Sequence, residues 1–285
     1  MPSALVFELR PHIATTLSTT TSRAAHAWLL DMIERSSPAI AASLHTAAEI
    51  RPFTTAFAPP QSLNHGPTTI EPYQVCALRI TLLSTELEAL ASAWSVDQIG
   101  EIMLEGMHWR VERVARSSDE HPWAGQSSYD QLITEAMGRA ATADGRWDLE
   151  FATPVTFRQR GKNQPLPTAD LVFGSLLDRW NTSAPMPLPP SLREAVEAQV
   201  AVSNVDLRSV VLPTKGGALQ IGVVGSCGYT LVGRDRTWVA SLDLLSRFAF
   251  YSGIGAGTTR GFGMSRLRER LHGRPAKKVQ TAEHA

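Results

Sequence analysis

Strand-like and helix-like patterns alternate along this chain, and their order constrains the fold more than any other feature. Residues 4–10 form a short apolar run typical of a strand, and the apolar residues of 22–34 recur at the spacing of one helix face. A second short helix, to about residue 48, is expected from Pro38, because Ser37 is a good N-cap and proline is favoured at the first helical position. The first half continues with strands over 50–57 and 73–83, a helix over 85–94 preceded by the capping residue Ser84, and a strand over 101–114.

The second half repeats this alternation with longer insertions. Each half shows the order β-α-β-β-α-β, which is the ferredoxin-like order shared with RNA-recognition modules. We therefore predict an α+β fold of two tandem ferredoxin-like domains, at residues 1–140 and 141–275, with a disordered tail over 276–285. The strands expected in the second half are 147–158, 206–212, 219–232 and 262–267, and the helices are 171–181, 191–202 and 235–251.

Composition limits the function without identifying it. The chain has 285 residues, with 27 Lys and Arg against 27 Asp and Glu, so any basic surface for nucleic acid must be local. The two cysteines, Cys76 and Cys227, are far apart, which argues against a disulfide scaffold and a cysteine zinc site. No run of about 20 apolar residues and no signal peptide is recognisable, so we expect a cytoplasmic protein without a membrane partner.

A glycine-rich segment between the last predicted helix and the last predicted strand is the sharpest local motif. It reads YSGIGAGTTRGFG over residues 251–263. Glycine permits positive φ angles and a close approach of the backbone, and successive N–H groups can bind an anion such as phosphate. A tight connection without any ligand would use the same residues. A nucleotide-binding glycine loop is disfavoured, because the segment lacks a Walker lysine and follows a helix instead of a strand.

Four segments in one order carry a resemblance to a known family. They are LH with RPFT within 44–54, HPWAG at 121–125, FATPVTFR at 151–158, and RFAFYSGIG with TTRGFG within 247–263. Together they resemble the CRISPR-associated endoribonucleases of the RAMP superfamily that process precursor CRISPR RNA. The resemblance implies a tandem ferredoxin-like fold and metal-independent cleavage of CRISPR repeat RNA, with no metal and no cofactor.

The resemblance also implies a catalytic site. His45 stands at the position of the catalytic histidine of the family, and Arg51 would supply positive charge near the phosphate. Metal-free cleavage needs a base for the 2′-hydroxyl and an acid for the leaving 5′-oxygen, and an imidazole with a pKa near ~6.5 suits both roles. His26 is the second candidate, because Leu30 replaces a tyrosine that some relatives carry on this helix. We expect His26 and His45 to divide the two roles, which stay unassigned.

RNA contacts are expected in two places. The run FRQRGK carries Arg158, Arg160 and Lys162 after a predicted strand, where a hairpin can grip an RNA stem as it does in many relatives. The expected partner is CRISPR repeat RNA, as precursor and as mature crRNA, and a homodimer and contacts with effector-complex subunits stay open. The alternative function is a catalytically inactive subunit that only binds the repeat RNA. The glycine-rich segment supplies the other RNA-binding candidates: Gly253, Gly255, Gly257, Thr258, Thr259, Arg260, Gly261 and Gly263.

Overall fold

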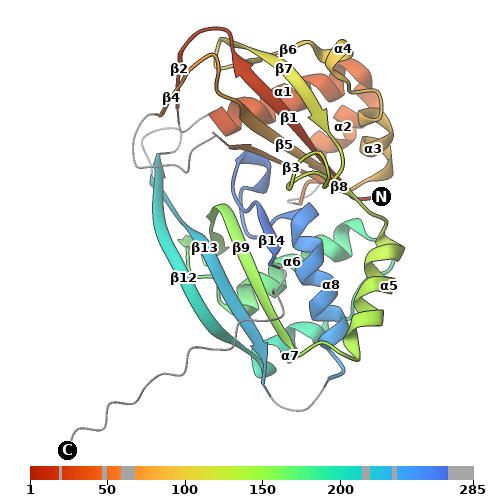
Figure 1. Cartoon of the computed structure of the whole chain (residues 1–285). Coiled ribbons are helices and arrows are strands. Elements are labelled where there is room, and N and C mark those ends of the chain that lie inside the picture. Colours follow the sequence, from red (N-terminus) through yellow and green to blue (C-terminus); the bar gives the residue numbers. More distant parts are fainter. Residues whose placement is uncertain (19–20, 47–49, 59–67, 214–218, 233–235, 269–285) are drawn as a thin grey trace, which may run out of the picture.

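The structure, a computed structural model, describes residues 1–18, 21–46, 50–58, 68–213, 219–232 and 236–268. Two modules, each built from a sheet and its helices, lie one above the other in Figure 1. The turn before the last strand of the second module reaches up to the first module. Both described cysteines are free and buried, and none of the described helices is long and apolar enough to cross a membrane.

The first module contains an antiparallel sheet in the order β3-β5-β1-β7-β6. Ala25, Leu29 and Ile33 of α1 pack on this sheet, which explains the helical spacing of these apolar residues. The side chain of Ser84 accepts a hydrogen bond from the backbone N–H of Leu87 at 3.3 Å and so caps α3. The elements are β1 (Ser3–Pro11), β2 (Thr15–Leu17), α1 (Thr21–Ser36), α2 (Pro38–Thr46), β3 (Phe53–Ala58), β4 (Thr68–Ile70), β5 (Cys76–Leu82), α3 (Thr85–Ala91), α4 (Val96–Ile99), β6 (Glu101–Leu104), β7 (Met107–Ala115) and β8 (Gly125–Gln126).

The second module contains an antiparallel sheet in the order β12-β13-β9-β14. Its core includes the rings of Trp180 and Phe248, which meet edge to face at 5.1 Å between α6 and α8. The main strands of both modules follow the spatial order second-third-first-fourth, which confirms the tandem ferredoxin-like fold. The elements are α5 (Tyr129–Ala140), β9 (Arg146–Val155), β10 (Phe157–Gln159), β11 (Lys162–Gln164), α6 (Ala169–Ser183), α7 (Ser191–Gln199), β12 (Val200–Pro213), β13 (Leu219–Leu231), α8 (Val239–Ser252), η1 (Thr258–Arg260) and β14 (Ser265–Leu267).

Several expected elements differ from the observed ones. The single strand expected over 101–114 is wrong: Glu105 and Gly106, with φ of 54° and 77°, form a two-residue turn that separates β6 from β7. The helix expected over 191–202 ends at Gln199, because Val200 already pairs with Leu231 in the sheet. The strand expected over 147–158 is two strands, β9 and β10. Other boundaries shift: the predictions for 50–57, 73–83, 85–94, 206–212, 235–251 and 262–267 correspond to β3, β5, α3, β12, α8 and β14.

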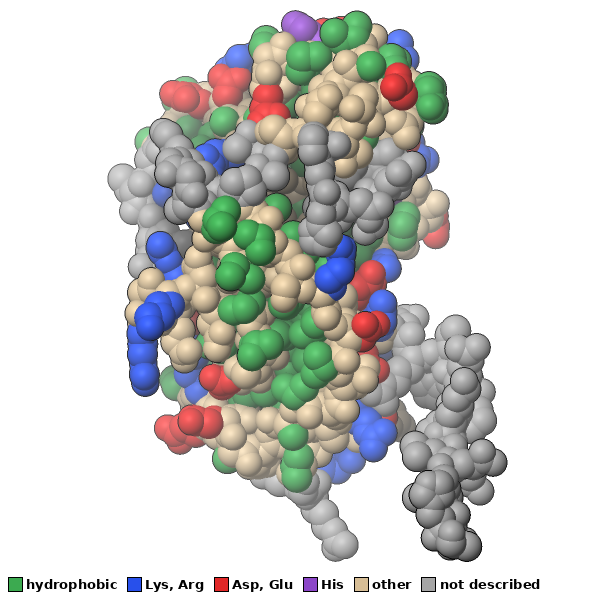
Figure 2. Space-filling model, turned by 90° about the vertical axis from the view of Figure 1, so that its left-hand side faces the viewer, with side chains coloured by type: hydrophobic (Ala, Val, Ile, Leu, Met, Phe, Trp, Pro, Cys, Tyr) green, Lys and Arg blue, Asp and Glu red, His purple; other side chains and the backbone are tan. Residues whose placement is uncertain are grey.

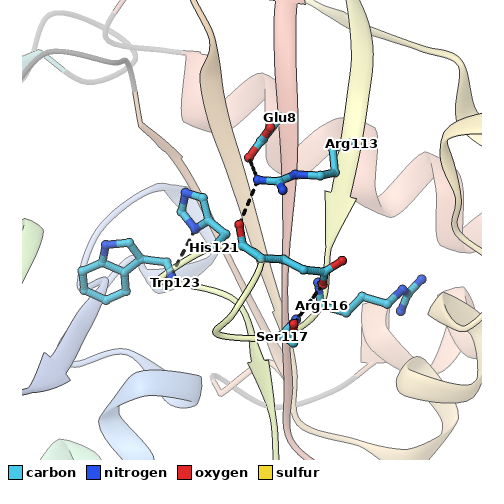
Figure 3. Close-up of polar contacts among 7 residues, drawn as sticks. Glu8, Arg113, Arg116, Ser117, His121 and Trp123 are labelled. Atoms are coloured by element: carbon cyan, nitrogen blue, oxygen red, sulfur yellow. Dashed lines mark hydrogen bonds and ion pairs between the residues drawn. The ribbon is translucent and has the colours of Figure 1, made fainter.

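The connection between the modules is ordered by polar contacts (Figure 3). Arg113 of β7 pairs with Glu8 of β1 and donates to the carbonyl of Glu120 at 2.8 Å. The Nδ1 atom of His121 accepts the backbone N–H of Trp123 at 3.1 Å. Helix α5 follows, and its apolar side chains join the core of the second module. The domain boundary after residue 140 stays a prediction, and residues 276–285 lie outside the described part.

Candidate functional site

A cleft of about 590 Å³ lies where the glycine-rich segment meets both modules. Ile50 and Arg51 contribute from the first module, before β3, and Phe157 and Arg158 contribute from β10. Helices α6 and α7 and residues 255–260 of the glycine-rich segment supply the remaining lining. Those residues are Asp170, Leu171, Gly174, Ser175, Asp178, Arg179, Arg193, Gly255, Ala256, Gly257, Thr258, Thr259 and Arg260.

The charged residues of the cleft are mainly arginines. Five arginines and two aspartates line it, and one of the aspartates, Asp178, pairs with Arg193. The lining therefore carries an excess of positive charge, although the chain as a whole has none. On the face shown in Figure 2, acidic and basic side chains are interspersed, and hydrophobic ones gather over the middle of the lower module. The expected local basic surface thus takes the form of a cleft, where low-dielectric walls strengthen the field.

Most backbone N–H groups of the glycine-rich segment donate hydrogen bonds to other groups of the protein. The N–H of Ile254 donates to the carbonyl of Gly263 at 2.9 Å, and the N–H of Gly263 donates to the carbonyl of Pro154 at 2.9 Å. Within the described residues, no hydrogen bond uses the N–H groups of Gly257, Thr258 and Thr259, and all three residues line the cleft. An anion in the cleft could therefore be bound by this short part of the segment rather than by its whole length.

The turn η1 docks the glycine-rich segment on the first module. The hydroxyl of Thr55 on β3 donates to the carbonyl of Thr259 at 2.7 Å, and the N–H of Gly261 donates to the carbonyl of Thr55 at 2.9 Å. A Cβ atom at Gly261 would lie 2.4 Å from the Cβ of Ser22 on α1, so only glycine permits this approach. The contact brings Arg260 close to helix α1.

His26 of α1 lies at this contact. Its ring stacks on Phe53 with 5.6 Å between centroids, and its Nδ1 atom is buried without a hydrogen-bond partner. Burial is the main cause that lowers the pKa of His26 below 6.5, and the positive charges of Arg260 and Arg51 lower it further. A hydrogen bond with the backbone of Thr259 acts in the opposite direction. His26 is therefore a neutral imidazole at neutral pH, beside the cleft and not part of its lining.

His45 lies in the last turn of α2, next to its final residue Thr46. Its side chain is outside the described part of the structure. Of the three expected catalytic residues, the structure thus brings His26 and Arg51 to the same place and describes only the backbone of the third. Arg51 itself lines the cleft.

The basic run FRQRGK forms a hairpin. Arg158 pairs with Asn163 across β10 and β11, and Arg160 and Gly161 make the turn with φ of 50° and 75°. The side chains of Arg158, Arg160 and Lys162 are exposed, and Arg158 also lines the cleft. The hairpin therefore extends the positive charge of the cleft outward.

Two cleft residues on α6 were not predicted from the sequence. Arg179 is buried, with 8% of its surface exposed, and donates to the carbonyl of Gly255 at 2.7 Å. Ser175 accepts the N–H of Gly255 at 3.0 Å. A signal for Arg179 does exist, since it is a charged residue within the stripe of buried apolar residues that includes Val172 and Leu176. The described residues contain no group of three or more His, Cys, Asp or Glu that could hold a metal ion.

Comparisons with known proteins match both modules. The family model of the CRISPR-associated endoribonuclease Cas6 matches residues 149–265, and that of the CRISPR Cas6 N-terminal domain matches residues 1–134. The product complex of Cas6 (TTHB231) is 28% identical and has a TM-score of 0.76, with 94% of this chain and 100% of that chain covered. Thermus thermophilus Cas6 (TTHB231) is also 28% identical, with a TM-score of 0.71 and coverage of 94% and 98%.

Two further structures extend the comparison. The substrate mimic complex of Cas6 (TTHA0078) is 26% identical, with a TM-score of 0.70 and coverage of 94% of this chain and 99% of that chain. A RAMP protein binding different RNA substrates is 14% identical with a TM-score of 0.60, and this likeness concerns the fold alone. No curated protein matches the sequence.

Proposed function

This chain belongs to the Cas6 family of CRISPR-associated endoribonucleases, and from that membership we propose that it cleaves CRISPR repeat RNA in the precursor transcript without a metal ion. The observation that carries the proposal is the close contact of η1 with α1 at Gly261 and Ser22, which brings Arg260 close to His26. Arg51, which precedes β3, also lies close enough to His26 to lower its pKa. A neutral imidazole beside a positively charged cleft, with two cations in the cleft lining, suits the cleavage of a phosphodiester.

The proposed reaction uses the RNA's own 2′-hydroxyl as the nucleophile. A base removes the hydroxyl proton while the 2′-oxygen forms a bond to phosphorus. The bond from phosphorus to the 5′-oxygen then breaks, and an acid protonates that oxygen. The products are a 2′,3′-cyclic phosphate and a 5′-hydroxyl, so every atom of the RNA is accounted for without a water molecule or a metal.

The two histidines take different roles in this proposal. His26 is the base, because its lowered pKa keeps it unprotonated at neutral pH. His45 is then the acid that protonates the leaving oxygen. Since Nδ1 of His26 is buried in the free protein, the base role requires that RNA binding expose one nitrogen of the ring. Each proton transfer contributes about 10²–10⁴-fold to the rate.

Stabilisation of the charged transition state falls to the cleft. Arg51 and Arg260 supply positive charge, and the unused N–H groups of Gly257, Thr258 and Thr259 supply donors. Arg158, Arg160 and Lys162 on the hairpin bind phosphates of the RNA away from the cut. The proposed partner is the repeat RNA, before and after cleavage, and the proposed location is the cytoplasm; effector subunits and a homodimer stay predictions.

The test uses the repeat RNA transcribed from the CRISPR array of the same genome. Wild-type protein should cut it once per repeat, whereas His45→Ala and His26→Ala should each bind it with nearly unchanged affinity and cut it at least about 100-fold more slowly. His108→Ala serves as the control, because that exposed histidine pairs with Glu101 away from the cleft. An RNA with a 2′-deoxy nucleotide at the cut should bind and stay intact.

The alternative function makes a different prediction in the same assay. A catalytically inactive repeat-binding subunit would bind the RNA tightly and leave it intact, with or without the His45→Ala substitution. Binding without any cleavage by the wild-type protein would therefore replace the endoribonuclease proposal with this one.

A further inference from the structure

We propose that Arg179 and Ser175 of α6 are positioning residues, which hold the glycine-rich segment in the geometry that cleavage requires by fixing the backbone of Gly255. The inference rests on the proposed function. Neither residue lies in the resembling segments, and neither is expected to touch the reacting atoms. They would act through the backbone of the segment that presents Thr258, Thr259 and Arg260 to the cleft.

The hydrogen bonds define the contact. Ser175 and Arg179 are four residues apart and so lie on the same face of α6. The hydroxyl of Ser175 accepts the N–H of Gly255 at 3.0 Å, and the guanidinium of Arg179 donates to the carbonyl of the same residue at 2.7 Å. The next N–H, that of Ala256, donates to the carbonyl of Thr156 at 2.7 Å. Three successive backbone groups are therefore held by α6 and by Thr156, the residue that joins β9 to β10.

The conformation and the surroundings of Gly255 leave no room for a side chain. Its φ of 79° lies in the left-handed region, and a Cβ atom would lie 2.4 Å from the carbonyl oxygen of Thr156. The backbone of the segment therefore packs directly against the backbone at the junction of β9 and β10. Gly257, where the unused N–H groups begin, is only two residues further along the chain. A shift at Gly255 would be transmitted to them directly.

The burial of Arg179 argues for more than packing. The residue is 8% exposed, and its Nε atom is buried without a hydrogen-bond partner. Burying a guanidinium with so few partners is costly, and an apolar side chain of similar volume would be cheaper among its apolar neighbours on α6. Burial lowers the pKa of Arg179 to about 10, so the side chain stays charged at neutral pH.

The test separates RNA binding from the cleavage step. Single-turnover cleavage of the repeat RNA is measured with excess protein, and affinity is measured with the 2′-deoxy RNA. Because small displacements of a catalytic group are costly, Arg179→Met should slow cleavage about 30- to 100-fold and Ser175→Ala about 3- to 10-fold, with affinity changed less than about threefold. Arg179→Lys keeps a charged donor and should recover part of the loss.

Tyr229→Phe is the matched control, because it removes a buried hydrogen bond, to the carbonyl of Pro167, from the same module without touching the cleft. It should lose stability and keep the cleavage rate. If the Arg179→Met protein fails to fold, the cleavage rate of the Ser175→Ala protein alone tests the inference. Cleavage at the wild-type rate by the Ser175→Ala protein, or a loss in both variants that follows affinity instead of rate, overturns the inference. Absence of cleavage by the wild-type protein would instead remove the proposed function.

Discussion

The guanidinium of Arg79 donates to the backbone carbonyl of Phe250 at 2.5 Å. This bond joins the sheet of the first module to the last turn of α8, directly before the glycine-rich segment. The same side chain donates to the carbonyl of Trp123 at 2.8 Å, and the rings of Trp123 and Phe250 stack in parallel at 6.0 Å. Arg79 is therefore a buried side chain that links the two modules.

Arg79→Met should destabilise the protein. Two partly buried carbonyls lose their donor, so we expect the free energy of unfolding to fall by about 2–4 kcal/mol in urea denaturation. Arg110→Met, at an exposed position of β7, should leave the urea midpoint unchanged. An Arg79→Met protein as stable as wild type would mean that these two hydrogen bonds contribute nothing net.

Gly261→Ala should weaken cleavage by pushing η1 away from α1. The new methyl group would lie 2.4 Å from the side chain of Ser22, and φ of 92° adds backbone strain. Thr259 and Arg260 would then move away from His26. Adding Ser22→Gly removes the clash but not the strain, so the double variant should recover part of the cleavage rate. Equal rates for the single and the double variant would show that the clash is not the cause.

The pH dependence of cleavage should report on His26. Since its pKa is lowered, the rising limb of the pH–rate profile should have a midpoint below 6.5, and the need for a protonated acid should produce a falling limb at higher pH. Arg260→Gln removes one of the causes, so the midpoint should move up toward 6.5 even as the maximal rate falls. Arg158→Gln, which does not contribute to this pKa, should leave the midpoint in place. If the Arg260→Gln protein has the same midpoint as the wild type, His26 is not the titrating base.

The same pKa has a consequence for stability. In the unfolded chain His26 takes up a proton below about pH 6.5, whereas in the folded protein it stays neutral until a lower pH. The contribution of neutral His26 to the free energy of unfolding is therefore complete above pH 6.5 and is lost as the pH falls below this value. Urea denaturation of His26→Gln should show a weaker loss of stability between neutral and acidic pH than the wild type shows.

The hairpin should contribute affinity through phosphates. Replacing Arg158, Arg160 and Lys162 by glutamine should weaken binding of the 2′-deoxy repeat RNA and reduce the slope of log affinity against log salt by about 2, given about 0.7–0.9 per phosphate contact. Arg139→Gln on α5, outside the cleft lining, is the control and should leave the slope unchanged. An unaltered slope in the triple variant would show that the hairpin does not bind phosphate.

Local patterns were sufficient to predict the fold. The stripe that includes Ala25, Leu29 and Ile33 becomes the packed face of α1, and Ser84 caps the helix that it was expected to cap. Errors arose where the backbone conformation of a few residues decides the structure. Nothing in the periodicity of 101–114 separates one long strand from two, and the positive φ at Glu105 and Gly106 makes the difference.

The site was predictable only where residues carry their own chemistry. The family resemblance pointed to Arg51, whereas His26 and Arg260 could be chosen as an imidazole and a cation, and the structure brings the three together. Arg79, Ser175 and Arg179 were missed, because their roles depend on carbonyl and N–H groups more than 70 residues away in sequence. The sequence of the segment permits either an anion site of successive N–H groups or a tight connection without a ligand. In the structure most of these N–H groups bind acceptors such as the carbonyls of Pro154 and Thr156, which no local pattern reveals.

Mapping the product ends after cleavage in excess EDTA is the sharpest test of metal-independent cleavage. Wild-type protein should cut the repeat RNA at an undiminished rate in EDTA, leaving a 2′,3′-cyclic phosphate on one fragment and a 5′-hydroxyl on the other. A 3′-hydroxyl end, or cleavage that stops in EDTA and returns with added divalent metal, would contradict it.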